Sequence, residues 1–389
     1  MNLKSLSLVL GLAAIWTTAG ADVVKIAVLA PLTGSVSAIG TDLRTGAQLA
    51  VDQRKAEFNR LGIQLETLVL DDKGDPTTGA NLIRETLLDP QVLGIVGPTK
   101  SGISLKVGEV LAASSNPAPL ISPSSTNDEL TQKGWKFFHR VTAPDGAQAD
   151  VAARYIAREL KPKAVFLVGD NTTFSNFLVE AIARELKQEG IKVVDSRSAN
   201  VGDAAGVQDI VARVKASGAE LVFHAGLYDS GAPLVKALRA ANSAVMIMGS
   251  NGLDSPDFIR AAQGDAAGVR FVTGLGPVEN YTNGQTFISA YRKAFNAAPA
   301  ARAVFTYDAM NAMLDALSSA ARKVGKTPTR AQVNTALNTV SVSAIRGVTG
   351  PIAFTPSGER RSSPMFIVEI DARTLQPMVV SGRRHLTSK

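Results

Sequence analysis

The chain has 389 residues and a formal net charge of +7, with 45% hydrophobic and 19% charged residues. This balance is ordinary for a globular chain long enough to form two domains, and it excludes a largely disordered protein. Lysines and arginines are scattered among acidic residues, and aromatic residues make up only 5% of the chain, so the excess positive charge does not indicate nucleic-acid binding. It is compatible with a mild preference for anionic ligands.

The first residues have the layout of a secretory signal peptide. Lys4 precedes an apolar run over 6–16 that is too short to span a bilayer, and small residues at 19–21 form a cleavage site. We therefore expect residues 1–21 to be removed. The sequence contains no cysteine that could form a disulfide or carry a lipid anchor. The expected product is a soluble protein of a bacterial periplasm.

From Asp22 onward, apolar runs typical of buried strands alternate with helical patterns. We expect strands at 23–31, 63–70, 92–97 and 118–122, and helices at 43–61, 80–88 and 103–114. Thr126 and Glu129 have the spacing of a capping box, which predicts a helix start there. Repeated strand–helix units predict a mostly parallel sheet with helices on both faces.

The alternation starts again after the segment "FFHRVTAPDG" (137–146). The strands expected in this second series are at 163–169, 191–196, 219–226 and 244–249. Residues 274–338 have mainly helical patterns, and the tail holds strand-like segments at 350–354 and 365–370. The sequence therefore predicts an α/β protein with two doubly wound units, in which the last segments return to complete the earlier domains.

Common catalytic and cofactor motifs are absent from the sequence. The segment "GIVGPTKS" (94–101) departs from a phosphate-binding P-loop, because Thr99 replaces the second glycine and Pro98 lacks an amide hydrogen. None of the three histidines lies in a recognised zinc, nucleophile or redox motif. We therefore predict a protein that is not an enzyme and that uses no cofactor and no metal.

Two consecutive strand ends lead into helices through hydroxyl-bearing loops, "PTKSG" and "PSSTN". In open α/β sheets, ligands bind at the carboxyl ends of the strands. Ser101 in the first loop and Ser124, Ser125 and Thr126 in the second would there form a donor-rich pocket for one carboxylate, together with the helix N-termini. Each loop alone is more often only a helix cap, but two such loops beside a second domain favour a binding cleft.

These residues carry a resemblance to the periplasmic branched-chain amino-acid binding proteins, the Leu/Ile/Val-binding receptors of ABC transporters. The similar stretches occur in family order over nearly the whole mature chain, and include "VKIAVLAPLTGSVSAIG", "LDDKGDP", "LISPSSTNDEL", "HRVTAPDGAQ", "IMGSNG", "TYDAMNAML" and "GVTGPIAF". The resemblance implies two α/β lobes that close around a ligand, with crossovers near 140–144, 271–274 and 350–355. It assigns 22–141 with 274–350 to one lobe, and 142–273 with 351–389 to the other.

The resemblance also implies roles for individual residues. Ser101 and Thr126 would hold the α-carboxylate of the ligand, and the carbonyl group of Ser124 would meet its α-ammonium group. The other implied pocket residues are Ile39 from the first lobe and Phe174, Leu227 and Tyr228 from the second. A membrane permease and an ATPase are the implied partners of a chain that would act as a monomer and bind no nucleic acid.

Two positions depart from the family pattern. Asn251 stands where amino-acid binders commonly have an acid that pairs with the ammonium group, and Phe174-Ser175 replaces a usual Tyr-Gly. An amide cannot neutralise a buried ammonium group, although Asp229 is an acid near the pocket loop in sequence. The ligand is therefore expected to be an amino acid or a related small carboxylate. Alternatives are a receptor for aromatic or other organic acids, and a receptor coupled to a sensor instead of a permease.

Overall fold

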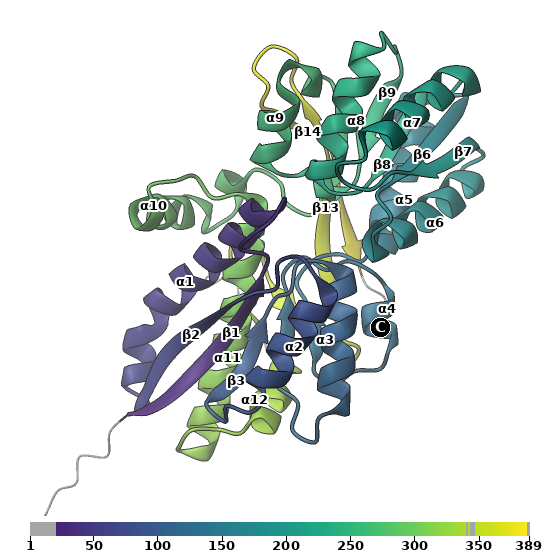
Figure 1. The fold of residues 1–389 in the computed structure, drawn as a ribbon. Helices are drawn as coiled ribbons and strands as arrows, with labels where there is room; N and C mark the ends of the chain where they lie inside the picture. The colour runs from purple at the N-terminus through teal and green to yellow at the C-terminus, as the bar shows by residue number, and fades with distance from the viewer. Residues whose placement is uncertain (1–20, 340, 343–346, 387–389) are drawn as a thin grey trace, which may run out of the picture.

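A computed structural model describes residues 21–339, 341–342 and 347–386, and residues 1–20 of the expected signal peptide lie outside the described residues. Two sheets, each flanked by helices, form two lobes that lie one above the other in Figure 1. We call the lobe around the five-stranded sheet lobe 1, and the lobe around the seven-stranded sheet lobe 2. In the described residues, no helix combines the length and the apolar character that a membrane span requires.

The sheet of lobe 1 is entirely parallel. In spatial order its strands are β2 (Ile63–Asp71), β1 (Asp22–Ala30), β3 (Val92–Val96), β4 (Leu120–Ser122) and β5 (Phe138–Arg140). All five residues of β3 are buried, as expected for an inner strand that helices cover on both faces. The predicted β/α alternation thus gives the predicted parallel sheet.

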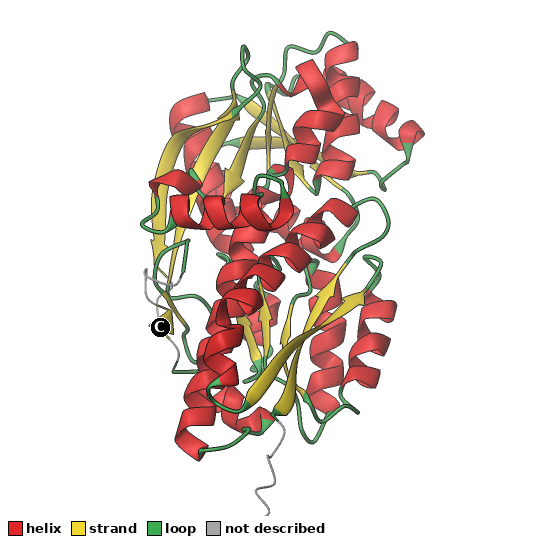
Figure 2. Ribbon diagram, turned by 90° about the vertical axis from the view of Figure 1, so that its left-hand side faces the viewer, coloured by secondary structure: helices red, strands yellow, loops and turns green. Residues whose placement is uncertain are grey.

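Helices cover both faces of this sheet, as Figure 2 shows. They are α1 (Ser37–Asn59), α2 (Pro76–Thr86), α3 (Ser101–Ala113), α4 (Glu129–Gln132), α10 (Gly284–Phe295), α11 (Ala301–Val324) and α12 (Arg330–Leu337). Helices α1 and α11 pack side by side, and α11 is buried around most of its circumference. It approaches β3 so closely that a Cβ atom added at Gly94 would lie 2.5 Å from the Sδ atom of Met313.

The sheet of lobe 2 is parallel except for its last two strands, which pair antiparallel. In spatial order it comprises β14 (Pro377–Leu386), β13 (Ser362–Ile370), β10 (Arg270–Thr273), β9 (Met246–Gly249), β8 (Leu221–Ala225), β6 (Ala164–Gly169) and β7 (Lys192–Ser198). Its helices are α5 (Asp145–Tyr155), the π-helix η1 (Ile156–Leu160), α6 (Thr173–Gln188), α7 (Ala204–Ser217), α8 (Tyr228–Ala240), the 3-10 helix η2 (Asn251–Leu253), α9 (Pro256–Ala262) and the 3-10 helix η3 (Gln263–Ala266).

Three connections join the two lobes. The chain leaves the lobe 1 sheet after β5, returns to lobe 1 after β10, and enters lobe 2 again between β12 (Ile352–Ala353) and β13. The 3-10 helix η4 (Val278–Asn280) lies on the second connection, and β12 pairs with β11 (Ser341–Val342). This topology confirms the predicted α/β fold with two doubly wound lobes. The exact residues at which the lobes divide remain a prediction.

Candidate functional site

A cavity of about 280 Å³ lies between the lobes, at the carboxyl ends of strands from both sheets. Its lobe 1 wall includes Ile39 of α1, the start of α3, and the loop after β4. Its lobe 2 wall includes the starts of α6 and η2. The volume is slightly below the range of about 300–1,000 Å³ that is usual for small-molecule sites. The space fits one small molecule enclosed by both lobes.

The hydroxyl groups at the end of β4 and in the loop after it have two different functions. Ser122 Oγ donates to the carbonyl oxygen of Pro98 at 2.8 Å and accepts from the amide of Ser125 at 2.9 Å. Ser125 is fully buried, and its hydroxyl lies 2.7 Å from that of Ser104 in α3. Ser124 and Thr126 instead line the cavity. The loop therefore uses two hydroxyls to hold its own shape and presents the other two to the cavity.

Ser101 brings the loop after β3 to the same part of the cavity wall. It is the first residue of α3, and its buried Oγ accepts from the amide of Asn127 at 3.2 Å. This bond joins the two loops that the sequence predicted to converge. Ser101, Ser124 and Thr126 thus line one cavity.

The predicted capping box between Thr126 and Glu129 is wrong. Helix α4 begins only at Glu129, and no side chain caps the helix from Asp128. The amide of Glu129 is bound by Asn127 Oδ1 at 2.8 Å. Thr126 lies before the helix, where its side chain lines the cavity and bonds to the Asp145 carboxyl group. A spacing that fits a capping box places the hydroxyl correctly only when the helix starts directly after it.

Asp145 lies at the start of α5, directly against the loop 123–128 between β4 and α4. We call this loop the cavity loop. Its amide donates to the carbonyl oxygen of Thr126 at 2.8 Å. Burial raises the pKa of this carboxyl group to about 7, although hydrogen bonds from Thr126 and Gln148 and the charge of Arg140 act in the opposite direction. The buried Asp145 therefore holds both the main chain and the side chain of Thr126 in place.

Lobe 2 contributes Phe174, Leu227 and Asn251 to the cavity wall. Phe174 lies in the first turn of α6, which is capped by a bond from the Ser175 amide to Thr172 Oγ1 at 3.1 Å. Leu227 directly precedes α8. The amide of Asn251 donates to Gln148 Oε1 at 2.6 Å, which fixes the main chain where η2 begins. These three positions are brought together as the sequence predicted.

Two predicted site residues do not line the cavity: Ser125, whose hydroxyl points to α3, and Tyr228. The hydroxyl of Tyr228 donates to the carbonyl oxygen of Ser35 at 3.0 Å and so joins α8 to lobe 1. Asp229, the acid that stood closest to the pocket loop in sequence, accepts a hydrogen bond from Ser35 Oγ at 2.7 Å and is not part of the cavity wall. Both side chains form contacts between the lobes.

Sequence reasoning missed two basic residues in the cavity wall, Lys100 and Arg302. Lys100 directly precedes α3, and Arg302 lies in the first turn of α11. Arg302 donates across the lobes to the carbonyl oxygens of Asp254, at 2.6 Å, and Asn251, at 3.1 Å. The only local signal was one arginine at the start of a mostly apolar helical stretch, "ARAVFTYDAMNAML".

The lobes touch directly at the edge of the cavity. A Cβ atom added at Gly102 in α3 would lie 2.9 Å from Thr173 Oγ1 in α6. Real Cβ atoms essentially never come this close to a neighbouring atom. The absence of a side chain at Gly102 therefore lets α3 and α6 meet beside the cavity.

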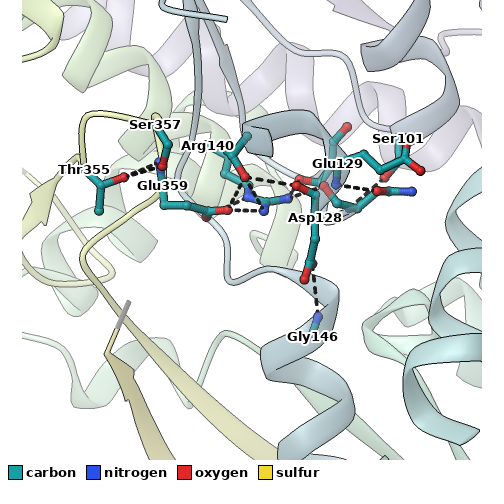
Figure 3. A network of polar contacts seen from close by, with 11 residues as sticks. Ser101, Asp128, Glu129, Arg140, Gly146, Thr355, Ser357 and Glu359 are labelled. Atoms are coloured by element: carbon teal, nitrogen blue, oxygen red, sulfur yellow. Dashed lines mark hydrogen bonds and ion pairs between the residues drawn. The ribbon is translucent and has the colours of Figure 1, made fainter. Parts of the chain in front are cut away.

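A buried polar network connects the cavity loop to the crossovers (Figure 3). Arg140, at the end of β5, donates through Nε to Glu359 Oε2 at 2.8 Å, and its Nη2 atom contacts Glu359 Oε1. Its Nη1 atom donates to the carbonyl oxygen of Asn127 at 2.8 Å. Figure 3 also shows Asp128 bound to the amide of Gly146, at 3.1 Å, at the start of α5. These bonds link the crossover segments to the loop that carries Ser124 and Thr126.

His224 is a core histidine. It is fully buried, and its Nε2 atom lies 3.1 Å from Ser230 Oγ and 3.3 Å from the carbonyl oxygen of Leu227. Burial lowers its pKa. The side chain supports the loop before α8 from behind and does not line the cavity.

Two lobes with a ligand-sized cavity between them define a class of ligand-binding proteins, and comparison with known proteins identifies the family. The model of a family described as periplasmic binding protein matches residues 23–374. A Leu/Ile/Val-binding protein homologue of Brucella melitensis is 29% identical over 94% of this chain and 96% of its own. The Leu/Ile/Val-binding protein BraC3 of Rhizobium johnstonii is 30% identical over 69% of this chain and 72% of its own.

The fold also matches solved structures. A leucine-binding protein of Thermotoga maritima superposes with a TM-score of 0.83 at 24% identity, covering 92% of this chain and 98% of its own. The chain belongs to the periplasmic binding protein family. Members of this family are solute-binding proteins and not enzymes. The predicted family and class of function are therefore confirmed.

Proposed function

We propose that this chain captures one small carboxylate between its lobes by hinge closure and delivers it to a membrane permease with its ATPase. The observation that carries the proposal is the cavity itself, because Ser101 and Thr126 of lobe 1 and Asn251 of lobe 2 line the same enclosed space. The names of the relatives, which are Leu/Ile/Val-binding proteins, support an amino acid or a related acid as the ligand. The chain would act as a monomer in the periplasm after loss of residues 1–21.

Within this proposal, the Ser101 hydroxyl donates to the ligand carboxylate, and the Thr126 hydroxyl donates to it in place of its present bond to Asp145. Both residues are at least 98% buried, so a bond to a charged oxygen would form away from water, where it is strong. The carbonyl group of Ser124 offers an acceptor beside them. Ile39, Phe174 and Leu227 supply apolar surface for the body of the ligand.

Contacts between the lobes support closure as the capture step. Tyr228 and Asp229 both bind Ser35 across the lobes, and Arg302 binds main-chain carbonyls of lobe 2. These bonds form only when the lobes meet, so they would favour the closed form once a ligand fills the cavity.

Native mass spectrometry of protein purified without denaturation tests the proposal. We expect one small organic acid bound per chain, and we expect it to be lost from a Ser101→Ala, Thr126→Ala double variant that remains folded. Calorimetric titration with leucine, valine, their 2-oxo acids and benzoate would then measure affinity. A folded protein that carries no small acid and binds none of these carboxylates would contradict the proposal.

A further inference from the structure

The charged side chains in the cavity wall are all basic. Lys100 and Arg302 line the cavity, and none of the wall residues in the described chain is an aspartate or a glutamate. Asn251 occupies the position at which the sequence comparison expected an acid. Asp229 lies outside the wall, bound to Ser35. The cavity therefore offers positive charge and no carboxylate to a ligand.

Arg302 is the more consequential of the two cations. Its side chain is part of a residue that is only 7% exposed, so water screens its charge poorly. Its described hydrogen bonds go to the carbonyl oxygens of Asn251 and Asp254 and not to a carboxylate. A carbonyl oxygen satisfies an N–H donor but supplies no countercharge. An anion in the cavity would add a countercharge from the ligand side.

The acids near these cations compensate them unequally. Lys100 is partly exposed and lies near the carboxyl group of Asp72. Asp254 and Asp42 are the two acids whose charges act on the Arg302 guanidinium group, and neither residue lines the cavity. Burial raises the pKa of Asp42 to about 7 and also raises that of Asp254. Both acids thus oppose the guanidinium charge from outside the cavity, and neither places a carboxylate where a ligand would meet it.

Helix N-termini add further positive potential. Helix α3 begins at Ser101, α6 at Thr173 and α8 directly after Leu227, and these three residues all line the cavity. Each N-terminus carries a partial positive charge from the aligned peptide dipoles. Together with Arg302, they stabilise a negative ligand and oppose a positive group on it.

We propose that the cavity selects small organic acids without an α-ammonium group, such as 2-oxo acids and aromatic carboxylates, and that Arg302 determines this selectivity. The inference rests on the proposed function, since it names the class of carboxylate that the same site takes. An α-ammonium group would be buried beside cations with no carboxylate to pair with it, and such like-charge contacts are strongly unfavourable. A ligand that carries only the carboxylate avoids this cost.

The test compares matched ligand pairs on three proteins. Calorimetry would measure leucine against 4-methyl-2-oxopentanoate, and phenylalanine against 2-oxo-3-phenylpropanoate, with benzoate as a further acid. The proteins are the wild type, Arg302→Gln and the control Arg330→Gln. Arg330 suits this control because it is also buried in lobe 1, and donates to the carbonyl oxygens of Val92 and Leu87, among others, away from the cavity.

We expect the wild type to bind at least one acid without an ammonium group at least about tenfold more tightly than an amino acid. Arg302→Gln should reduce this ratio at least about tenfold, and Arg330→Gln should leave it unchanged. The ratio of the two affinities is the readout because weaker contact between the lobes would lower both affinities equally and leave the ratio unchanged. Preference for the amino acids, or an equal loss for both ligand types in Arg302→Gln, would overturn the inference alone. Failure of every carboxylate to bind would overturn the proposed function as well.

Discussion

Replacing Glu359 by Gln should both destabilise the protein and weaken ligand binding. Arg140 is 0% exposed and the Glu359 side chain 9%, so the substitution leaves the arginine charge buried without its partner. Breaking a buried ion pair in this way costs about 3–5 kcal/mol. Arg140 also binds the carbonyl oxygens of Ser125 and Asn127 on both sides of Thr126. A displaced guanidinium would therefore disturb the cavity loop.

Urea denaturation measures the loss of stability, and calorimetry in the absence of urea measures the change in affinity. The matched control is Glu369→Gln, because Glu369 pairs with Arg270 at 2.6 Å where the two side chains are 28% and 20% exposed. An ion pair with that access to water contributes about 0–1 kcal/mol. If both variants lose the same small amount of stability, the buried pair is not the strong constraint that we infer. If Glu359→Gln unfolds more easily but binds ligand normally, the link to the cavity loop is wrong.

Three further predictions concern closure, the carboxylate contacts and pH. Gly102→Leu should block the approach of α3 to Thr173 and weaken ligand binding measured by calorimetry. The control Gly264→Leu, where an added Cβ atom meets open space, should bind ligand normally. Equal affinities of the two variants would contradict the close approach of the lobes. Ser101→Ala and Thr126→Ala should each weaken carboxylate binding roughly 10- to 150-fold, and lower melting temperatures with unchanged affinity would show a purely structural role. Burial lowers the pKa of His139 to about 4, so the protein loses stability as pH falls from about 6.5, the usual pKa of an exposed histidine, towards 4. The unfolded chain protonates His139 more readily than the folded protein does. Urea denaturation should therefore show that His139→Gln loses less stability than the wild type between pH 7 and pH 4.5. Equal losses in the two proteins would refute the assignment to His139.

The buried parallel strands were predictable from the sequence because each is a short apolar run between turn residues. The expected strands at 92–97 and 163–169 correspond to β3 and β6 almost residue for residue. β5, β10, β11 and β14 were not predicted. β14 is an edge strand that pairs only with β13, and its residues 378–380 are exposed apolar side chains. Tertiary pairing and not a local hydrophobic pattern defines such a strand.

The candidate site was predictable where its residues follow strand ends. Ser101, Ser124 and Thr126 belong to loops whose place at the carboxyl ends of parallel strands follows from the topology. Ser125 could not be separated from them, because the direction of its hydroxyl depends on Ser104 in the neighbouring helix. Arg302 could not be predicted at all, since it reaches the cavity only through the packing of α11 against the rest of lobe 1 and its contacts with lobe 2.

Small-angle X-ray scattering with and without a saturating ligand tests most directly whether this protein captures its ligand by closure. The ligand would be the carboxylate that binds most tightly in the calorimetric panel. The account predicts a smaller radius of gyration for the bound wild-type protein, and little change for Gly102→Leu at the same ligand concentration. An unchanged radius in the wild type, with binding confirmed by calorimetry on the same sample, would contradict capture between closing lobes.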